Sequence, residues 1–176
     1  MKGKWTALHI ECTGVKKLTL LAVLLAVGLV LGVLEGMLPV FAVLPGAKLG
    51  IANVVTMLAL VWFGPFSALL IGVLRAGLVG VFSGMATMAF YGGAGSVLSV
   101  AAMFLMRRFF GEKTSLAGVS MVGAFFFQVG QVAVFAAVIH NIQMFRYLPV
   151  LTLISTVCGL VTGWIAEKIT KFQMTR

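Results

Sequence analysis

Few residues in this sequence could do acid–base or metal chemistry. The sequence contains no aspartate. This excludes three kinds of site that require one: an Asp-rich site for a magnesium-bound diphosphate, a Walker B acid and an Asp-containing catalytic triad. The four acidic residues are Glu11, Glu35, Glu112 and Glu167.

Nucleotide-binding and metal-binding motifs are also missing. No G-x-x-x-x-G-K-[ST] occurs, and the run GEKT at 111–114 lacks the Gly-Lys pair that holds a phosphate. Cys12 and Cys158 lie outside any C-x-x-C spacing and His140 stands alone, so we expect free thiols and no metal site. We predict a protein that is not an enzyme by itself, needs no cofactor and takes any ATP-derived energy from a partner.

The composition decides the fold class. Hydrophobic residues make up 61% of the 176 residues, charged residues 10%, and the mean hydropathy is +1.15. A soluble domain is about 25% charged, so this chain could not hide its apolar side chains in water. We predict an all-α integral membrane protein, because the apolar runs are unbroken and lack the alternation of a β-barrel.

Six apolar runs approach the length of about 20 residues that a helix needs to cross a bilayer. They cover about 18–38, 49–63, 66–82, 85–106, 116–139 and 148–169. The second and third are short and are separated by Gly64-Pro65, a natural helix break. We therefore expect a basic leader at 1–17, one six-helix membrane domain at 18–169 and a tail at 170–176.

The basic residues give an independent test of this count, because cytoplasmic loops hold the excess of Lys and Arg. With six spans and both termini cytoplasmic, Lys48 and Arg146 fall on the outer side and Arg75 falls inside a span. The inner side receives the other ten: Lys2, Lys4, Lys16, Lys17, Arg107, Arg108, Lys113, Lys168, Lys171 and Arg176. The net charge of +9 thus reflects orientation in the membrane and not a nucleic-acid partner.

Polar side chains from different spans gather toward the outer leaflet in this topology, which is the pattern of a pocket that opens outward. Gln128 and Gln131 are one turn apart and share a helix face. The candidate ligand-binding residues are Glu35, Lys48, Asn53, Arg75, Tyr91, Gln128 and Gln131.

Arg75 is nearest the predicted midplane and needs a partner. An arginine at mid-membrane costs at least about 2.5–3.5 kcal/mol even on a lenient insertion scale. Two interpretations stay open: an ion pair with Glu35 that serves helix packing, or contact with an anionic or polar ligand.

The first span carries small residues four apart, which let another helix approach closely. Ala22 and Ala26 start this seam, and Gly28, Gly32 and Gly36 continue the same spacing. Packing inside the bundle and docking of a partner are both open for Ala22 and Ala26. Gly159 and Gly163, also four apart, favour internal packing in the last span.

Four stretches resemble a known family: LPGAKLGIANVVTMLAL at 44–60, LRAGLVGVFSG at 74–84, VGQ at 129–131 and YLPVL at 147–151. The chain resembles the Gx transporter family, also labelled heptaprenyl diphosphate synthase component I. That family is similar to the substrate-binding S components of energy-coupling factor (ECF) transporters. Phe127-Gln128 departs from the His-Asn pair expected before Gly130-Gln131.

The resemblance implies an S-component-like bundle in a bacterial cytoplasmic membrane that captures a small molecule from outside. It also implies a separate transmembrane coupling protein and a pair of cytoplasmic ATPases, with Ala22 and Ala26 at the contact to the coupling protein. The alternatives are a non-catalytic membrane accessory subunit of a prenyl diphosphate synthase in isoprenoid quinone synthesis, and an independent membrane enzyme or channel.

Overall fold

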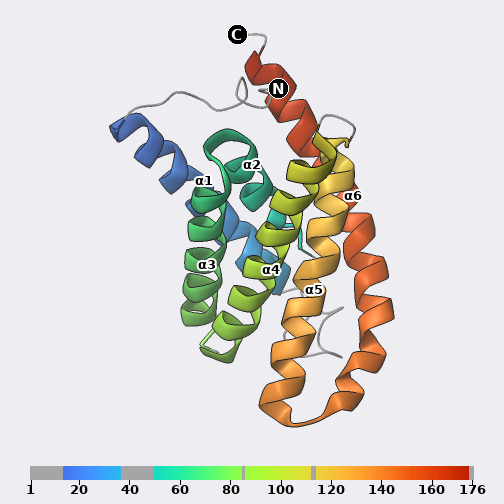
Figure 1. Cartoon of the computed structure of the whole chain (residues 1–176). Coiled ribbons are helices and arrows are strands. Elements are labelled where there is room, and N and C mark those ends of the chain that lie inside the picture. Colours follow the sequence, from blue (N-terminus) through green and yellow to red (C-terminus); the bar gives the residue numbers. More distant parts are fainter. Residues whose placement is uncertain (1–13, 37–49, 85, 112–113, 175–176) are drawn as a thin grey trace.

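The computed structural model describes residues 14–36, 50–84, 86–111 and 114–174, and these residues form helices joined by short connections (Figure 1). Lys48, Glu11 and Cys12 lie outside the described residues. The helices are α1 Val15–Gly36, α2 Asn53–Phe63, α3 Pro65–Phe82, α4 Ala86–Phe110, α5 Leu116–Ile139, the 3-10 helix η4 Ile142–Tyr147 and α6 Leu148–Met174.

The all-α prediction is confirmed, and six α-helices stand where six apolar runs were expected. Five of them are long and apolar enough to cross a membrane. The helices extend beyond the expected runs at both ends: α1 begins at Val15, within the expected leader, and α6 continues to Met174, within the expected tail.

The second predicted span is the largest departure. Its helix, α2, has 11 residues, which is about 16 Å of helix and roughly half of the hydrocarbon thickness. All 11 are buried, because α2 packs against the other five α-helices. This half-length helix is therefore the centre of the bundle, and the run at 49–63 is apolar on every side because every side is covered.

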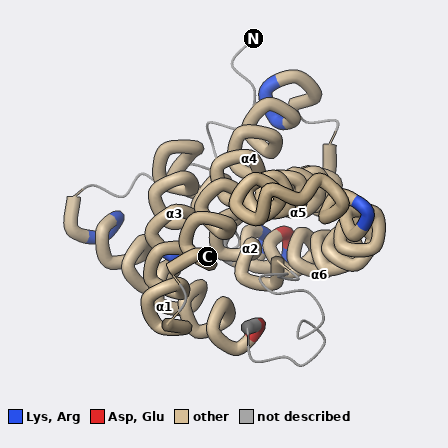
Figure 2. The backbone as a smooth tube through the Cα atoms, turned by 90° about the horizontal axis from the view of Figure 1, so that it is seen from below, with Lys and Arg blue, Asp and Glu red and all other residues tan. Residues whose placement is uncertain are grey.

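The connections place the two ends of the bundle. The described start of α1, the end of α4 and the end of α6 lie at one end, while the α3–α4 and α5–α6 connections lie at the other (Figure 1). The first end carries Lys16, Lys17, Arg107, Arg108, Lys168 and Lys171. Figure 2 shows how few charged residues the rest of the bundle holds. The positive-inside rule predicts that this basic end faces the cytoplasm.

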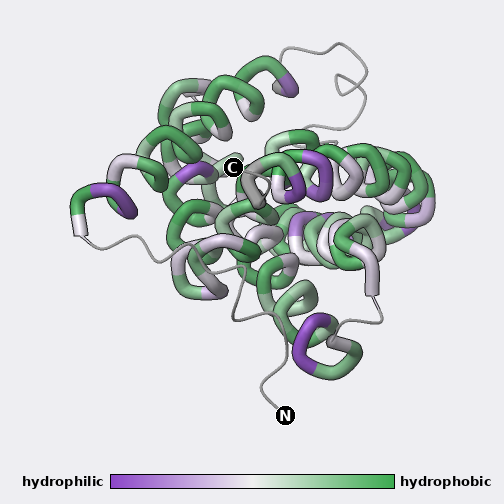
Figure 3. The backbone as a smooth tube through the Cα atoms, turned by 90° about the horizontal axis from the view of Figure 1, so that it is seen from above, coloured by the Kyte–Doolittle hydropathy of each residue, from purple (hydrophilic) through white to green (hydrophobic). Residues whose placement is uncertain are grey.

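Most of the bundle is built from hydrophobic residues (Figure 3). Large apolar side chains are exposed on every long helix, including Val30, Val81, Phe90, Phe126 and Leu153. Water would not tolerate so much exposed apolar surface, whereas lipid tails would cover it. The chain is thus a multi-pass membrane protein.

Glycines allow the closest helix contacts. A Cβ added to Gly163 of α6 would lie 2.5 Å from Ala117 Cα of α5, and one added to Gly159 would lie 3.1 Å from Met121 Cα. Ser120 and Thr162 share a hydrogen bond of 2.9 Å across the same contact. The expected packing role of Gly159 and Gly163 is therefore what the structure shows.

Candidate functional site

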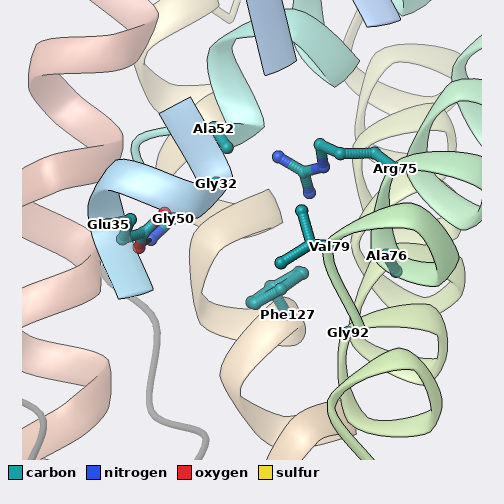
Figure 4. Close-up of a pocket in the computed structure, with 9 residues that line it drawn as sticks. All are labelled: Gly32, Glu35, Gly50, Ala52, Arg75, Ala76, Val79, Gly92 and Phe127. Atoms are coloured by element: carbon teal, nitrogen blue, oxygen red, sulfur yellow. Dashed lines mark hydrogen bonds between the residues drawn. The ribbon is translucent and has the colours of Figure 1, made fainter. Parts of the chain in front are cut away.

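One pocket brings residues of four helices and the turn before α2 together (Figure 4). Its lining is Gly32 and Glu35 of α1, Gly50 and Ala52, Arg75, Ala76 and Val79 of α3, Gly92 of α4 and Phe127 of α5. About 10 Å³ is open to the centre of a water molecule, which is room for about one ordered water. Any larger occupant must displace side chains of this lining.

Arg75 enters the pocket from the middle of α3. The residue is 5% exposed, and Nη1 has no hydrogen-bond partner. Figure 4 shows the guanidinium reaching from α3 toward Ala52 and α1. A buried donor without an acceptor costs about 1–3 kcal/mol, and more when it is charged, so this arrangement calls for a further group.

Glu35 lies on the opposite wall of the pocket, near the end of α1. The residue is 3% exposed, and its carboxylate accepts a hydrogen bond from the Gly50 backbone N–H (Figure 4). Gly50 has φ +83°, a left-handed conformation that glycine adopts without strain, and its carbonyl accepts from Asn53 N–H at 2.9 Å. Glu35 thus holds the turn from which α2 begins.

The two interpretations of Arg75 can now be compared with the geometry. Arg75 and Glu35 share the pocket and attract each other electrostatically. They do not form a direct ion pair, because the Glu35 carboxylate bonds Gly50 while Arg75 Nη1 is unbonded among the described residues. Ligand contact by Arg75 stays a prediction.

Asn53 lies deeper than its sequence position indicated. It was expected at the outer start of the second span, but Asn53 Nδ2 donates to Ser99 Oγ at 3.4 Å, and Ser99 is near the middle of the 25-residue α4. The reason is the shortness of α2, whose first residue lies at mid-depth. Asn53 is buried next to the lining residue Ala52, and its Oδ1 has no hydrogen-bond partner.

The remaining predicted site residues are buried beside the pocket but are not part of its lining. Tyr91 packs edge-to-face on Phe135 with ring centroids 5.2 Å apart. Gln128 and Gln131 are 1% and 4% exposed on the face of α5 that also carries Phe127. These three stay predictions, and Lys48 falls outside the described residues.

Several lining residues could not be found from their chemistry. Val79, Ala76 and Phe127 resemble ordinary core residues in the sequence. Gly50, in contrast, belongs to the PGAKLGIAN stretch that carries the family resemblance, and this was the one available signal.

The small-residue seam of α1 divides into two faces. Gly28 and Gly32 are buried, and a Cβ on each would lie 3.2 Å from Arg75 Cδ and 2.9 Å from Val79 Cγ2, respectively. Ala22 and Ala26 are exposed. Gly28 follows Ala22 by six residues, a rotation of about 240° on a helix, so the expectation of one continuous seam was wrong.

Among the residues described here, no three His, Cys, Asp or Glu side chains are grouped so that they could hold a metal ion. What the bundle offers is a buried pocket with one positive and one negative side chain on opposite walls. Fold and site together define a multi-pass, all-α membrane protein with a charged internal pocket.

The family model for heptaprenyl diphosphate synthase component I matches residues 24–169. The chain belongs to this family, as the resemblance indicated. No curated protein and no solved structure matches the chain.

Proposed function

We propose that this chain is the substrate-binding subunit of an ECF-type importer in a bacterial cytoplasmic membrane. It captures a small polar or anionic molecule from the outer side. The single observation that carries the proposal is Arg75, a 95% buried arginine whose Nη1 has no partner and lies in a pocket. Ionisable residues within membrane helices are expensive and mark ligand pathways.

The position of the pocket supports capture from outside. Its lining runs from Arg75, near the middle of α3, to Gly92, which is in the second turn of α4 after the α3–α4 connection. That connection lies at the end opposite the basic, cytoplasmic end. The energy for release inward comes from partners, a transmembrane coupling protein and a pair of cytoplasmic ATPases.

The test uses the tagged full-length chain purified from its native membranes. We expect the coupling protein and ATPases to co-purify, and native mass spectrometry to find a small molecule on the wild-type chain. Arg75→Ala and Asn53→Ala should lose that molecule while unfolding at the same temperature as the ligand-free wild type. Arg146→Ala, an exposed position in η4, is the matched control and should keep it.

Recovery of neither partner nor ligand would sink the transporter proposal. Ligand bound normally by the Arg75→Ala chain would return that arginine to a packing role.

The family description supports a second candidate function, a non-catalytic accessory subunit of a prenyl diphosphate synthase in isoprenoid quinone synthesis. The lack of aspartate means that the synthase chemistry must reside in a soluble partner. Adding this chain in vesicles to such a synthase should then change its product length. Unchanged kinetics and product length would remove this candidate.

A further inference from the structure

The start of α2 is a helix N-terminus placed inside the bundle. The Asn53–Ser99 contact puts it level with the middle of α4, and its first residues Asn53, Val54 and Val55 are all buried. The N-cap residue is Ala52, so no side chain caps the helix. A helix N-terminus carries roughly half a positive charge, and a low-dielectric surrounding leaves that charge poorly screened.

A second positive group faces the same space. Ala52, Gly50 and Arg75 all line the pocket, and the guanidinium of Arg75 points toward Ala52 (Figure 4). Arg75 contributes a full charge and a buried Nη1 donor without a partner. Two independent features, a helix dipole and an unsatisfied cation, thus converge on one small volume.

The carboxylate of Glu35 is an example of an anionic group bound at this end of α2. It is drawn to the backbone N–H of Gly50, in the turn that begins α2, and so supplies one anion at this helix end. Arg75 Nη1, on the other wall of the pocket, has no hydrogen-bond partner among the described residues. One further anionic oxygen, placed between Arg75 and the start of α2, would meet the remaining donor.

We infer that the N-terminus of α2 and the guanidinium of Arg75 together form a mid-membrane binding site for the anionic group, carboxylate or phosphate, of the captured molecule. This inference rests on the proposed function and names the chemistry of its ligand. Discontinuous membrane helices whose N-termini meet anionic substrate groups are a general solution in transporters. Glu35 acts as a positioning residue that fixes the Gly50 turn.

The site also sets a charge limit on the ligand. Among the described residues that line the pocket, the charges of Arg75 and Glu35 cancel formally, and the helix end adds about half a positive charge. A single carboxylate or a singly charged phosphate ester is therefore the best match, and a multiply charged group would be repelled by Glu35.

The experiment measures thermal unfolding of the purified full-length chain in chloride-free detergent buffer with three probes: acetate, inorganic phosphate and neutral acetamide. Ligands that bind only the folded state raise its unfolding temperature, and the rise grows with the logarithm of ligand concentration divided by Kd. We expect stabilisation by acetate or phosphate, at least about tenfold tighter than by acetamide. Whichever anion binds more tightly distinguishes a carboxylate from a phosphate site.

Arg75→Gln should lower the affinity for the anion at least about tenfold, which is the effect of losing a hydrogen bond to a charged group. Arg146→Gln should leave the affinity for the anion unchanged. Ala52→Asp tests the helix end, because it places a carboxylate beside the first turn of α2. This variant should keep its unfolding temperature but lose the response to anions. If Ala52→Asp fails to fold, Arg75→Gln decides alone.

Equal stabilisation by acetamide, no stabilisation by any anion, or wild-type anion affinity in Arg75→Gln would overturn the inference. Retained affinity in a folded Ala52→Asp chain would also overturn it. Failure of the transporter proposal looks different: anions bind as predicted, yet no coupling protein co-purifies.

Discussion

Gly28 of α1 leaves the space that the side chain of Arg75 crosses on its way from α3 to the pocket. A Cβ at Gly28 would lie 3.2 Å from Arg75 Cδ and 3.4 Å from Val55 Cβ of α2. The aliphatic part of the Arg75 side chain thus packs against α1 at Gly28, a position with no polar side chain. The pocket therefore depends on how closely α1 approaches α2 and α3.

Substituting Gly28 should consequently disturb the ligand site without touching a polar residue. Gly28→Val adds an isopropyl group against Arg75 and Val55, which we expect to cost about 1–3 kcal/mol of stability and to weaken anion binding. Gly77→Val is the control, since a Cβ at Gly77 of α3 meets nothing within 4 Å. Thermal unfolding with and without acetate measures both effects, and equal behaviour of the two variants would show that Gly28 does not position Arg75.

The fold could be predicted from sequence to the extent that hydropathy and charge determine it. Apolar runs gave the helices, and the basic residues at the ends of α1, α4 and α6 gave a consistent orientation. Neither hydropathy nor charge could predict that α2 crosses only about half of the membrane, because a buried half-length helix and a short membrane span are equally apolar. The misplacement of Asn53 at the outer surface followed from that ambiguity.

The site was predictable only where charge is rare. Arg75 and Glu35 stood out because a charged residue in an apolar run must find a partner, and the structure places them in one pocket. Phe127 and Val79 carried no such signal. The division of the α1 seam could have been predicted, since a separation of six residues already places Ala22 and Gly28 on different faces of a helix. The structure adds that the Gly28 face is the buried one.

Ala22 and Ala26 are exposed on α1, the long helix with the least buried span. If this face meets the coupling protein, a bulky side chain there should block docking and leave the ligand pocket intact. We expect Ala22→Trp and Ala26→Trp to reduce the coupling protein recovered with the tagged chain at least about tenfold, while acetate still stabilises both variants.

Val30→Trp provides the matched control for this face, because Val30 is 57% exposed on α1 two turns further from the cytoplasmic end than Ala22. It should recover the coupling protein normally. Equal losses at Val30 and Ala22 would indicate a general intolerance of bulk on α1, and no loss at Ala22 or Ala26 would place the docking surface elsewhere.

The predicted orientation can be tested by thiol labelling. In a chain with Cys12→Ser and Cys158→Ser, we expect Ile142→Cys, 81% exposed in η4, to react with a membrane-impermeant maleimide in intact cells. Phe109→Cys, at a position 76% exposed near the end of α4, should react only after permeabilisation. The reverse pattern would invert the topology and place the α3–α4 and α5–α6 connections in the cytoplasm.

The α5–α6 contact gives the sharpest stability prediction. A Cβ at Gly163 would meet backbone of α5 at 2.5 Å, and backbone cannot swing aside as a flexible side chain does. Gly163→Ala should therefore push α6 away from α5, weaken the hydrogen bond between Ser120 and Thr162, and destabilise the fold by about 1–3 kcal/mol.

The same substitution at Gly93 of α4 should have the opposite sign. A Cβ at Gly93 would meet nothing within 4 Å. Only the low helix propensity of glycine then matters, so Gly93→Ala should leave the stability of the fold unchanged or raise it by about 0.5–1 kcal/mol. Denaturant unfolding in mixed micelles measures both variants on one scale. If Gly163→Ala is as stable as Gly93→Ala, then α5 and α6 do not pack as closely in the membrane as this structure places them.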